Sequence, residues 1–179
     1  MKDVLAIRPK LAEQDRLLDA AVLGFRSGIR RAADGPFFVS AGFFAPHDPF
    51  WPPQRFIDMY DPSTLPAPHM TEDQRKHAGL SDDEWRIVRQ HYYALITHLD
   101  DQFGRILDAL DEAGLRERTM IVFTSDHGEN LGDHGRGGKG MPGWDSQARI
   151  PLIISWPEGI EAGRVSDALV EGVDILPTM

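Results

Sequence analysis

A stripe of large apolar side chains at helical spacing runs through the middle of the chain and predicts one long helix. Ser81, with Glu84 three residues later, forms a capping box that predicts where the helix begins. Gly114 is a suitable residue just beyond its end. We expect the stripe to be buried in a core, because an apolar helix face needs a packing partner. Its members are Trp85, Val88, Tyr92, Leu95, Leu99, Phe103, Ile106 and Leu110.

Short apolar runs before and after this helix predict buried strands at 36–42, 119–124 and 150–155. A further helix is predicted over Gln14 to Ala33, and Asp174 is a candidate cap for a last one. Helices and strands that alternate along a chain are typical of an α/β layer structure. The sequence therefore predicts an α/β fold.

Composition narrows the class of protein further. The chain has 179 residues, 41% of them hydrophobic and 26% charged, which is typical of one globular domain. Its net charge of −9 argues against nucleic-acid binding, and no apolar run is long enough to span a bilayer. The absence of cysteine excludes disulfides and thiolate metal sites. Oligomeric state stays open, as does the choice between a periplasmic or secreted and a cytoplasmic location.

A proline-rich segment from Ala45 to Met70 is predicted to lack regular structure, because proline fixes φ and removes a hydrogen-bond donor. His47 lies between two of the prolines, just after a predicted strand. An imidazole held stiffly there could donate a proton near neutral pH. The alternative is a loop histidine that caps a backbone group.

Asp126 and His127 directly follow the predicted strand 119–124, where ligands bind in parallel α/β sheets. Gly128 allows a tight turn, so that both side chains could reach one ion. A carboxylate oxygen and an imidazole nitrogen suit a divalent cation. The alternative is a turn in which Asp126 accepts hydrogen bonds from backbone amides.

Five of the nine residues from Gly132 to Gly140 are glycine. Such a loop lets backbone amides approach an anion closely, and Lys139 adds a positive charge for a tetrahedral oxyanion. His134 could orient a neighbouring ligand. The alternatives are a flexible, solvated loop and a histidine bonded to the backbone.

These three patterns, in this order, resemble the sulfatases of the alkaline-phosphatase superfamily. Ala45 to Phe50 resembles their Pro-His-x-Pro loop, Ile121 to Glu129 their metal-binding strand end, and Leu131 to Gly140 their lysine loop. The resemblance runs from about Gln14 to the last residue. The Asp-His pair resembles the subgroup that contains iduronate-sulfatase-like enzymes and phosphonate monoester hydrolases.

The resemblance implies an alkaline-phosphatase-like α/β fold, with a mixed, mainly parallel sheet flanked by helices and incomplete in this chain. Residues 1–179 would form a partial catalytic domain, with 45–70 as an insertion. Asp126 and His127 would supply two of four side chains that bind a divalent cation, by preference Ca²⁺, with Mn²⁺ and Mg²⁺ as alternatives. Lys139 would contact the sulfate and its bridging oxygen, and His47 would help the leaving group to depart.

One departure from the family is large. The family's nucleophile is a formylglycine made in a Cys/Ser-x-Pro-x-Arg motif, and this sequence has no such motif. The two aspartates that complete the metal site also lack counterparts. We therefore expect the chain to begin after the nucleophile and to end before the C-terminal subdomain.

The resemblance leaves three functions open. The first is a parent enzyme that hydrolyses sulfate esters of small molecules or saccharides, with no nucleic-acid or membrane partner. In that case the isolated chain should show no turnover. The second is a phosphonate monoester or phosphodiester hydrolase of the same superfamily. The third is a non-catalytic remnant with a binding role.

Overall fold

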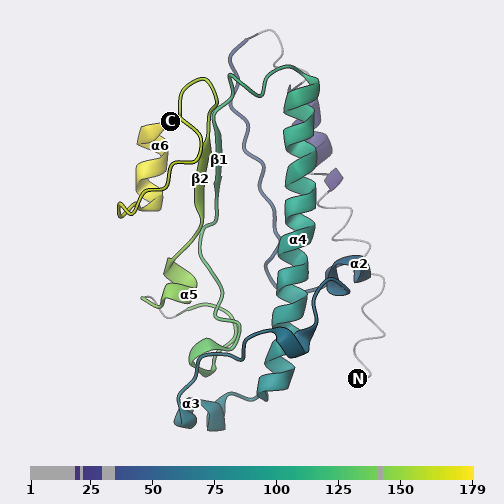
Figure 1. Cartoon of the computed structure of the whole chain (residues 1–179), viewed down its shortest axis with the longest axis vertical. Coiled ribbons are helices and arrows are strands. Elements are labelled where there is room, and N and C mark those ends of the chain that lie inside the picture. The colour runs from purple at the N-terminus through teal and green to yellow at the C-terminus, as the bar shows by residue number, and fades with distance from the viewer. Residues whose placement is uncertain (1–18, 21, 30–34, 141–142) are drawn as a thin grey trace. The chain divides into compact units, whose positions relative to one another are not determined.

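The computed structural model describes residues 19–20, 22–29, 35–140 and 143–179. They form two compact units (Figure 1). The first unit comprises the described residues up to Leu115 together with Leu131–Gly137, and the second comprises Arg116–Asn130 with the described residues from Gly138 onward. The glycine-rich loop is thus divided between the two units.

Helix α4, Asp82–Glu112, is the main element of the first unit and confirms the predicted long helix (Figure 1). Ser81 and Glu84 form the predicted capping box, a feature that stabilises a helix start by about 1 kcal/mol. Gly114 has a φ of +65°, the left-handed conformation that ends helices. The stripe members that are buried are Trp85, Leu95, Ile106 and Leu110.

The proline-rich segment is mostly irregular, as predicted, but it contains two short helical turns. These are α2, Gln54–Ile57, and the 3-10 turn η1, Pro62–Thr64. Both pack against α4. Phe56 stacks on the buried His98 with 4.8 Å between ring centroids. Apolar contact with α4 therefore orders part of a segment that local sequence would leave without regular structure.

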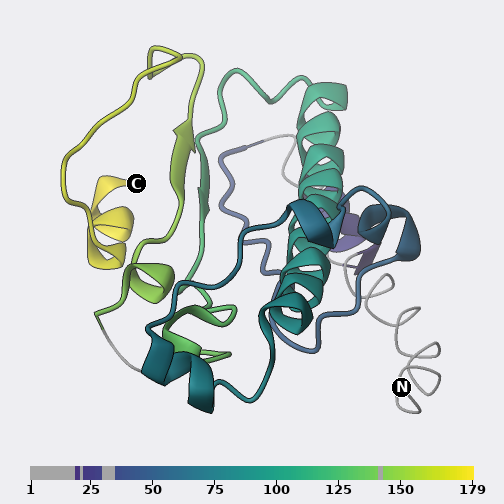
Figure 2. The same cartoon turned by 60° about the horizontal axis from the view of Figure 1, so that its bottom comes forward.

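Helix α3, Glu72–His77, was not predicted from the sequence. The signal was present, because Thr71 and Gln74 form a second capping box. Figure 2 shows α3 beside the 3-10 turn η2, Asp133–Gly135, which also belongs to the first unit.

The second unit is built on two strands, β1 (Ile121–Thr124) and β2 (Leu152–Ser155), which confirm two predicted strands. They pair antiparallel, with Ile121 opposite Ser155. The sheet was predicted to be mainly parallel, and this antiparallel pair is the only sheet among the described residues.

The predicted strand at 36–42 is wrong, because none of those residues is in a strand. A strand exists only where a neighbouring strand accepts and donates ladder hydrogen bonds. The described strands pair only with each other, so the apolar run 36–42 has no ladder to join.

The predicted first helix, Gln14 to Ala33, is helical at 19–20 and 22–29, and the rest of it lies outside the described residues. The last helix, α6, spans Ile175–Thr178 directly after Asp174, as predicted. Asp174 does not cap α6 through its carboxylate, which instead accepts a hydrogen bond from the Glu171 amide at 2.8 Å.

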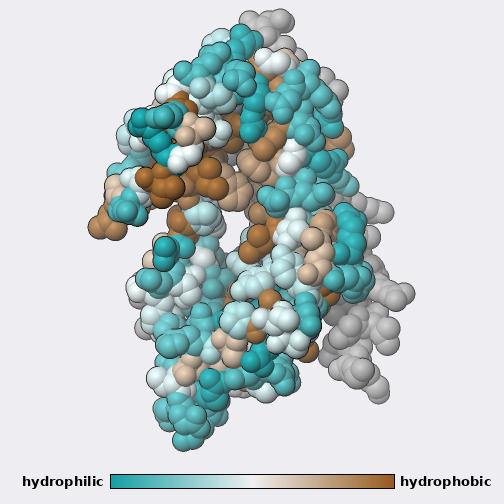
Figure 3. All heavy atoms as spheres, viewed as in Figure 1, coloured by the Kyte–Doolittle hydropathy of each residue, from teal (hydrophilic) through white to brown (hydrophobic). Residues whose placement is uncertain are grey.

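Several apolar side chains of the C-terminal segment are exposed, and Figure 3 shows hydrophobic residues gathered near α6. The exposed ones there include Val165, Leu169, Val173 and Leu176. None of the helices in the described part of the chain combines the length and the apolar character that crossing a bilayer requires.

Candidate functional site

Asp126 lies just beyond the end of β1 and presents an open carboxylate, since its side chain is 85% exposed. Its Oδ1 accepts a hydrogen bond from the His127 amide at 2.9 Å, the backbone contact that the alternative interpretation expected. Slight burial acts to raise the pKa of Asp126. The His127 amide, the charge of His127 and the Ser125 hydroxyl together outweigh this effect and hold the pKa below its ordinary value of 3.8. The carboxylate is therefore ionised at neutral pH.

The ring of His127 is oriented by its own turn. Nδ1 lies 2.8 Å from the carbonyl oxygen of Gly128. Because a carbonyl can only accept, Nδ1 carries a proton, and whenever the ring is neutral the lone pair lies on Nε2. Nε2 lies 3.6 Å from Oδ2 of Asp126. The two donor atoms that a cation would need are therefore adjacent, and the ring is in the tautomer that binds metals through Nε2.

This donor pair fits part of a divalent-cation site. Ca²⁺ takes about six to eight oxygen ligands, so two side chains would hold it only weakly. Nowhere in the described part of the chain do three or more histidine and acidic side chains form a cluster that could hold a metal ion. Asp126 and His127 would therefore need ligands from elsewhere to complete a site.

The turn after His127 is held tightly against α5, Asp145–Ala148. The amide of Gly128 donates to the carbonyl of Gln147 at 2.8 Å. A Cβ at position 128 would lie 2.1 Å from the carbonyl oxygen of Ser146, so no other residue fits without moving the backbone. The close approach at Gly128 therefore fixes the path on which Asp126 and His127 leave the strand.

Lys139 belongs to the same unit and is exposed. Its neighbours Gly138 and Gly140 have φ of +74° and +127°. Among the described residues, no hydrogen bond or ion pair joins Lys139 to Asp126 or His127. The lysine loop and the strand end are linked through Gln147 of α5 instead, whose carbonyl accepts from the Gly128 amide and whose Oε1 accepts from the Gly140 amide.

The loop that carries His47 is held against α4 within the first unit. Ala45 packs on Leu95 in a small buried cluster. At the other end of the loop, the ring of Phe50 meets Tyr92 edge-on with centroids 5.4 Å apart, and the carbonyl of Phe50 lies 3.1 Å from Nδ1 of His91.

His47 itself is partly exposed and packs against the ring of Phe44, with centroids 4.6 Å apart. Its Nδ1 lies 2.7 Å from the carbonyl oxygen of Asp48 and 3.1 Å from the Asp48 carboxylate. The ring thus bonds a backbone group, as the alternative interpretation expected. The same bond places the proton on Nδ1 and makes Nε2 the nitrogen that could act on a substrate.

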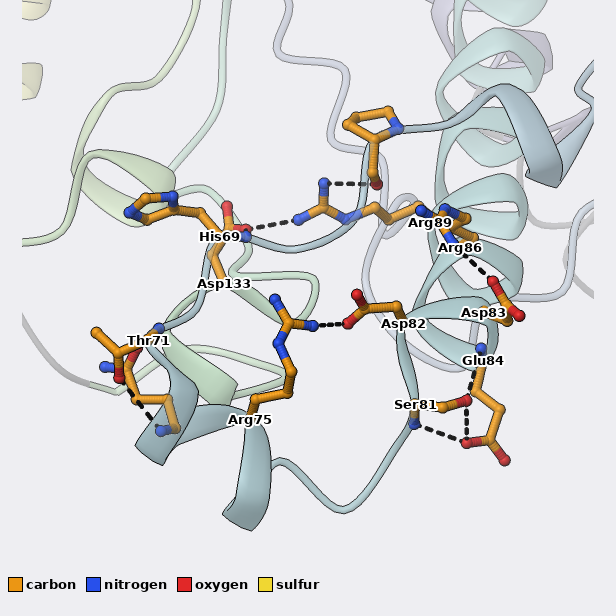
Figure 4. A network of polar contacts seen from close by, with 12 residues as sticks. His69, Thr71, Arg75, Ser81, Asp82, Asp83, Glu84, Arg86, Arg89 and Asp133 are labelled. Atoms are coloured by element: carbon orange, nitrogen blue, oxygen red, sulfur yellow. Dashed lines mark hydrogen bonds and ion pairs between the residues drawn. The ribbon is translucent and has the colours of Figure 1, made fainter.

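The part of the glycine-rich loop in the first unit is anchored rather than solvated. Arg89 of α4 donates from its guanidinium to Oδ1 of Asp133 at 2.6 Å (Figure 4). It also donates to the carbonyl of Leu131 at 3.0 Å. The amide of His69 donates to the same Asp133 oxygen at 2.6 Å. The amide of His134 donates to the carbonyl of His69 at 2.8 Å, so this histidine is bonded through its backbone.

Four residues whose hydrogen bonds hold the glycine-rich loop or the turn after His127 were not predicted from the sequence: Arg89, Asn130, Asp133 and Gln147. Arg89 could have been found, because it lies one turn after Trp85 on the buried helix face, where a cation needs an anion. No pattern marks Asn130 or Gln147. They are neutral amides with no recognisable spacing between them in the sequence, and only the folded chain brings them together.

Comparison with known proteins supports the resemblance over nearly the whole chain. A family model described as Sulfatase matches residues 6–179. An arylsulfatase from Clostridium perfringens is 36% identical over 166 residues, which cover 84% of this chain and 34% of that protein. Human iduronate 2-sulfatase is 32% identical over 199 residues, which cover 83% of this chain and 36% of that protein. The chain spans about a third of the length of these curated relatives.

A solved structure shows the same fold. The phosphonate monoester hydrolase from Silicibacter pomeroyi superposes with a TM-score of 0.79 at 30% identity, over 88% of this chain and 36% of that one. The expected alkaline-phosphatase-like fold is thereby confirmed. Proteins of this family generally use a divalent metal and a formylglycine. The extent of the family match and the identity to named sulfatases establish that this chain belongs to the sulfatase family.

Proposed function

We propose that this chain is part of a metal-dependent hydrolase of sulfuric esters and supplies part of its catalytic site. One observation carries the proposal. The bond from Nδ1 of His127 to the Gly128 carbonyl leaves the metal-binding nitrogen Nε2 next to the open carboxylate of Asp126. That arrangement is a prepared half of a cation site at the end of a strand.

Each residue has a defined role in this proposal. Asp126 and His127 would hold the cation, by preference Ca²⁺, with Mn²⁺ and Mg²⁺ as alternatives. Bound there, the cation would supply positive charge that neutralises the oxygens of the sulfate group. Lys139 would stabilise the charge that develops on the transferred group. With its ring protonated on both nitrogens, His47 would donate the Nε2 proton to the leaving alcohol and keep the Nδ1 proton on the Asp48 carbonyl. The nucleophile would come from a part of the full-length protein that this chain does not include.

The named relatives favour a sulfate ester as substrate. They include an arylsulfatase, iduronate 2-sulfatase and a choline-sulfatase, so the substrate would be a small-molecule or saccharide sulfate ester. The alternative is phosphonate monoester hydrolysis, which the superposition on the Silicibacter pomeroyi enzyme supports. A sulfate ester and a phosphonate monoester share tetrahedral geometry and a single negative charge, so one anion site could accept either.

A two-substrate assay of the purified full-length protein tests the choice. We expect kcat/KM for an aryl sulfate to exceed kcat/KM for an aryl phosphonate monoester. The reverse order would establish the phosphonate alternative. Turnover of neither substrate in the presence of Ca²⁺, Mn²⁺ or Mg²⁺ would contradict both and leave a binding role.

Calorimetric titration of the full-length protein with Ca²⁺ tests the cation site separately. Asp126→Asn removes the charge of one ligand and should weaken Ca²⁺ binding by about tenfold or more. Asp145→Asn is the matched control, because it changes another exposed carboxylate of the same unit. Equal Ca²⁺ affinity of the Asp126→Asn variant and the wild type would remove Asp126 from the cation site.

A further inference from the structure

Two buried amide side chains lie next to the candidate site and have no role in the mechanism so far. Asn130 is 2% exposed and Gln147 is 9% exposed. Nε2 of Gln147 donates to Oδ1 of Asn130 at 3.0 Å, and the hydroxyl of Ser146 donates to the same oxygen at 2.7 Å. Buried polar groups persist where their hydrogen bonds fix one arrangement, so this pair is a rigid point in the second unit.

The same two residues hold the backbone on both sides of Lys139. The amide of Asn130 donates to the carbonyl of Gly138 at 3.2 Å. The amide of Gly140 donates to Oε1 of Gln147 at 3.3 Å. Glycines with positive φ on each side of Lys139 offer little resistance to rotation of their own, so these external bonds set the position of the lysine.

Gln147 also contacts the other half of the candidate site. Its backbone carbonyl accepts the hydrogen bond from the amide of Gly128, the residue that follows His127. One residue of α5 therefore bonds the turn after the Asp126-His127 pair through its backbone and the lysine loop through its side chain.

We propose that Gln147, held in place by Asn130, is a positioning residue that sets Lys139 relative to the Asp126-His127 strand end. The inference rests on the proposed function of Lys139. Both amides are neutral and buried, so they would act through the geometry of the lysine and not on the substrate. A displacement of about 1 Å in a charged group can cost about a hundredfold in rate. A lysine between two glycines therefore needs hydrogen bonds from other residues to hold its backbone in place.

Gln147→Met in the full-length protein removes both side-chain hydrogen bonds at nearly constant volume. We expect kcat on an aryl sulfate to fall by about tenfold or more, while KM stays within about twofold. Gln90→Met is the matched control. Gln90 is a partly buried amide of α4 that donates to the carbonyl of Tyr60 at 2.6 Å, in the other unit. The kcat of the Gln90→Met protein should equal that of the wild type. An unchanged kcat for Gln147→Met would overturn the proposal.

A double-mutant cycle separates positioning from general stability. If Gln147 acts through Lys139, then Gln147→Met should cost less than about twofold in a protein that already carries Lys139→Ala. Fully additive losses would show that Gln147 has a structural role only and would overturn the proposal. A normal kcat for Lys139→Ala alone would instead contradict the proposed function itself.

Thermal unfolding checks that each variant is folded. If Gln147→Met does not fold, Gln147→Asn replaces it, because it keeps an amide but shortens the side chain by one methylene. The shorter amide cannot bridge Asn130 and Gly140, so the same selective loss of kcat and the same lack of additivity with Lys139→Ala are expected. Wild-type kcat in a folded Gln147→Asn protein would overturn the proposal.

Discussion

The guanidinium of Arg89 and the carboxylate of Asp133 form an ion pair of 2.6 Å that joins helix α4 to the glycine-rich loop. The Arg89 side chain is 8% exposed and the Asp133 side chain 28%. Arg89 also donates to the carbonyls of Leu131 and Pro66. One buried cation thus connects the long helix, the end of the proline-rich segment and the loop.

Asp133→Asn should destabilise the full-length protein by about 2 kcal/mol, because it leaves the buried Arg89 without an anion. The value is set below that of a fully buried pair, since Asp133 is partly exposed. Asp83→Asn makes the same chemical change in a side chain that is 89% exposed and should cost less than about 1 kcal/mol. Urea unfolding measures both. An equal loss of unfolding free energy in Asp133→Asn and Asp83→Asn would show that burial of the Arg89–Asp133 pair contributes nothing to stability.

The capping box at the start of α4 should make the free energy of unfolding depend on pH in the acidic range. Hydrogen bonds from the Ser81 amide and hydroxyl lower the pKa of Glu84 from 4.5. A lowered folded-state pKa gives stabilisation that is present above the ordinary pKa and is lost as pH falls through the lowered value. Glu84→Gln keeps a capping acceptor but cannot titrate, as in the Thr71–Gln74 box of α3.

The free energy of unfolding of the wild type should therefore exceed that of Glu84→Gln near neutral pH. The difference should shrink as the pH falls below 4.5. Urea unfolding across this pH range measures it. If the free energies of unfolding of the wild type and of Glu84→Gln changed in parallel with pH, the assignment of the titration to Glu84 would be contradicted.

Local signals account for how well the fold was predicted. The capping box at Ser81 and the positive φ of Gly114 fixed both ends of α4, because each depends on residues within one helical turn. The apolar runs that became β1 and β2 were likewise readable. The run at 36–42 failed because a strand needs a partner, and pairing is not encoded in the run itself.

The same contrast between local and long-range signals holds for the candidate site. Asp126, His127 and Lys139 were identified because they belong to short motifs with recognisable spacing. The bonds that orient them were not foreseeable, since Gln147 meets Gly128 and Gly140 only through the folded backbone. Sequence spacing indicated which groups are candidates for the chemistry, whereas their positioning depends on long-range contacts.

Gly128→Ala should disrupt the strand end, because the added Cβ would lie 2.1 Å from the Ser146 carbonyl oxygen. We expect Ca²⁺ affinity to fall by about tenfold or more through misplacement of Asp126 and His127. Gly104→Ala is the control, since a Cβ at this position would meet no atom within 4 Å beyond its chain neighbours and the backbone of its own helix, and alanine in α4 should stabilise by about 0.5–1 kcal/mol. Calorimetric titration with Ca²⁺ compares the two variants, and unchanged affinity in Gly128→Ala would refute the role of this close contact.

Replacement of His47 should depend on the leaving group. His47→Gln should lower kcat by about a hundredfold or more on an alkyl sulfate, whose alkoxide needs a proton to depart. On a nitrophenyl sulfate the loss should be smaller than about tenfold, because that leaving group departs without one. His77→Gln is the matched control, since its Nδ1 also lies 2.9 Å from a backbone carbonyl oxygen. Equal losses on both substrates would exclude proton donation by His47.

The most direct test of the account is kcat/KM of the full-length protein on an aryl sulfate after Lys139→Ala. Lys76→Ala, which removes another exposed lysine, is the control and should leave kcat/KM unchanged. The account predicts a loss of about a hundredfold or more, because the ammonium group would stabilise charge on the transferred group. Activity of Lys139→Ala within a factor of about three of the control would contradict the claim that this lysine and the Asp126-His127 pair serve one anion site.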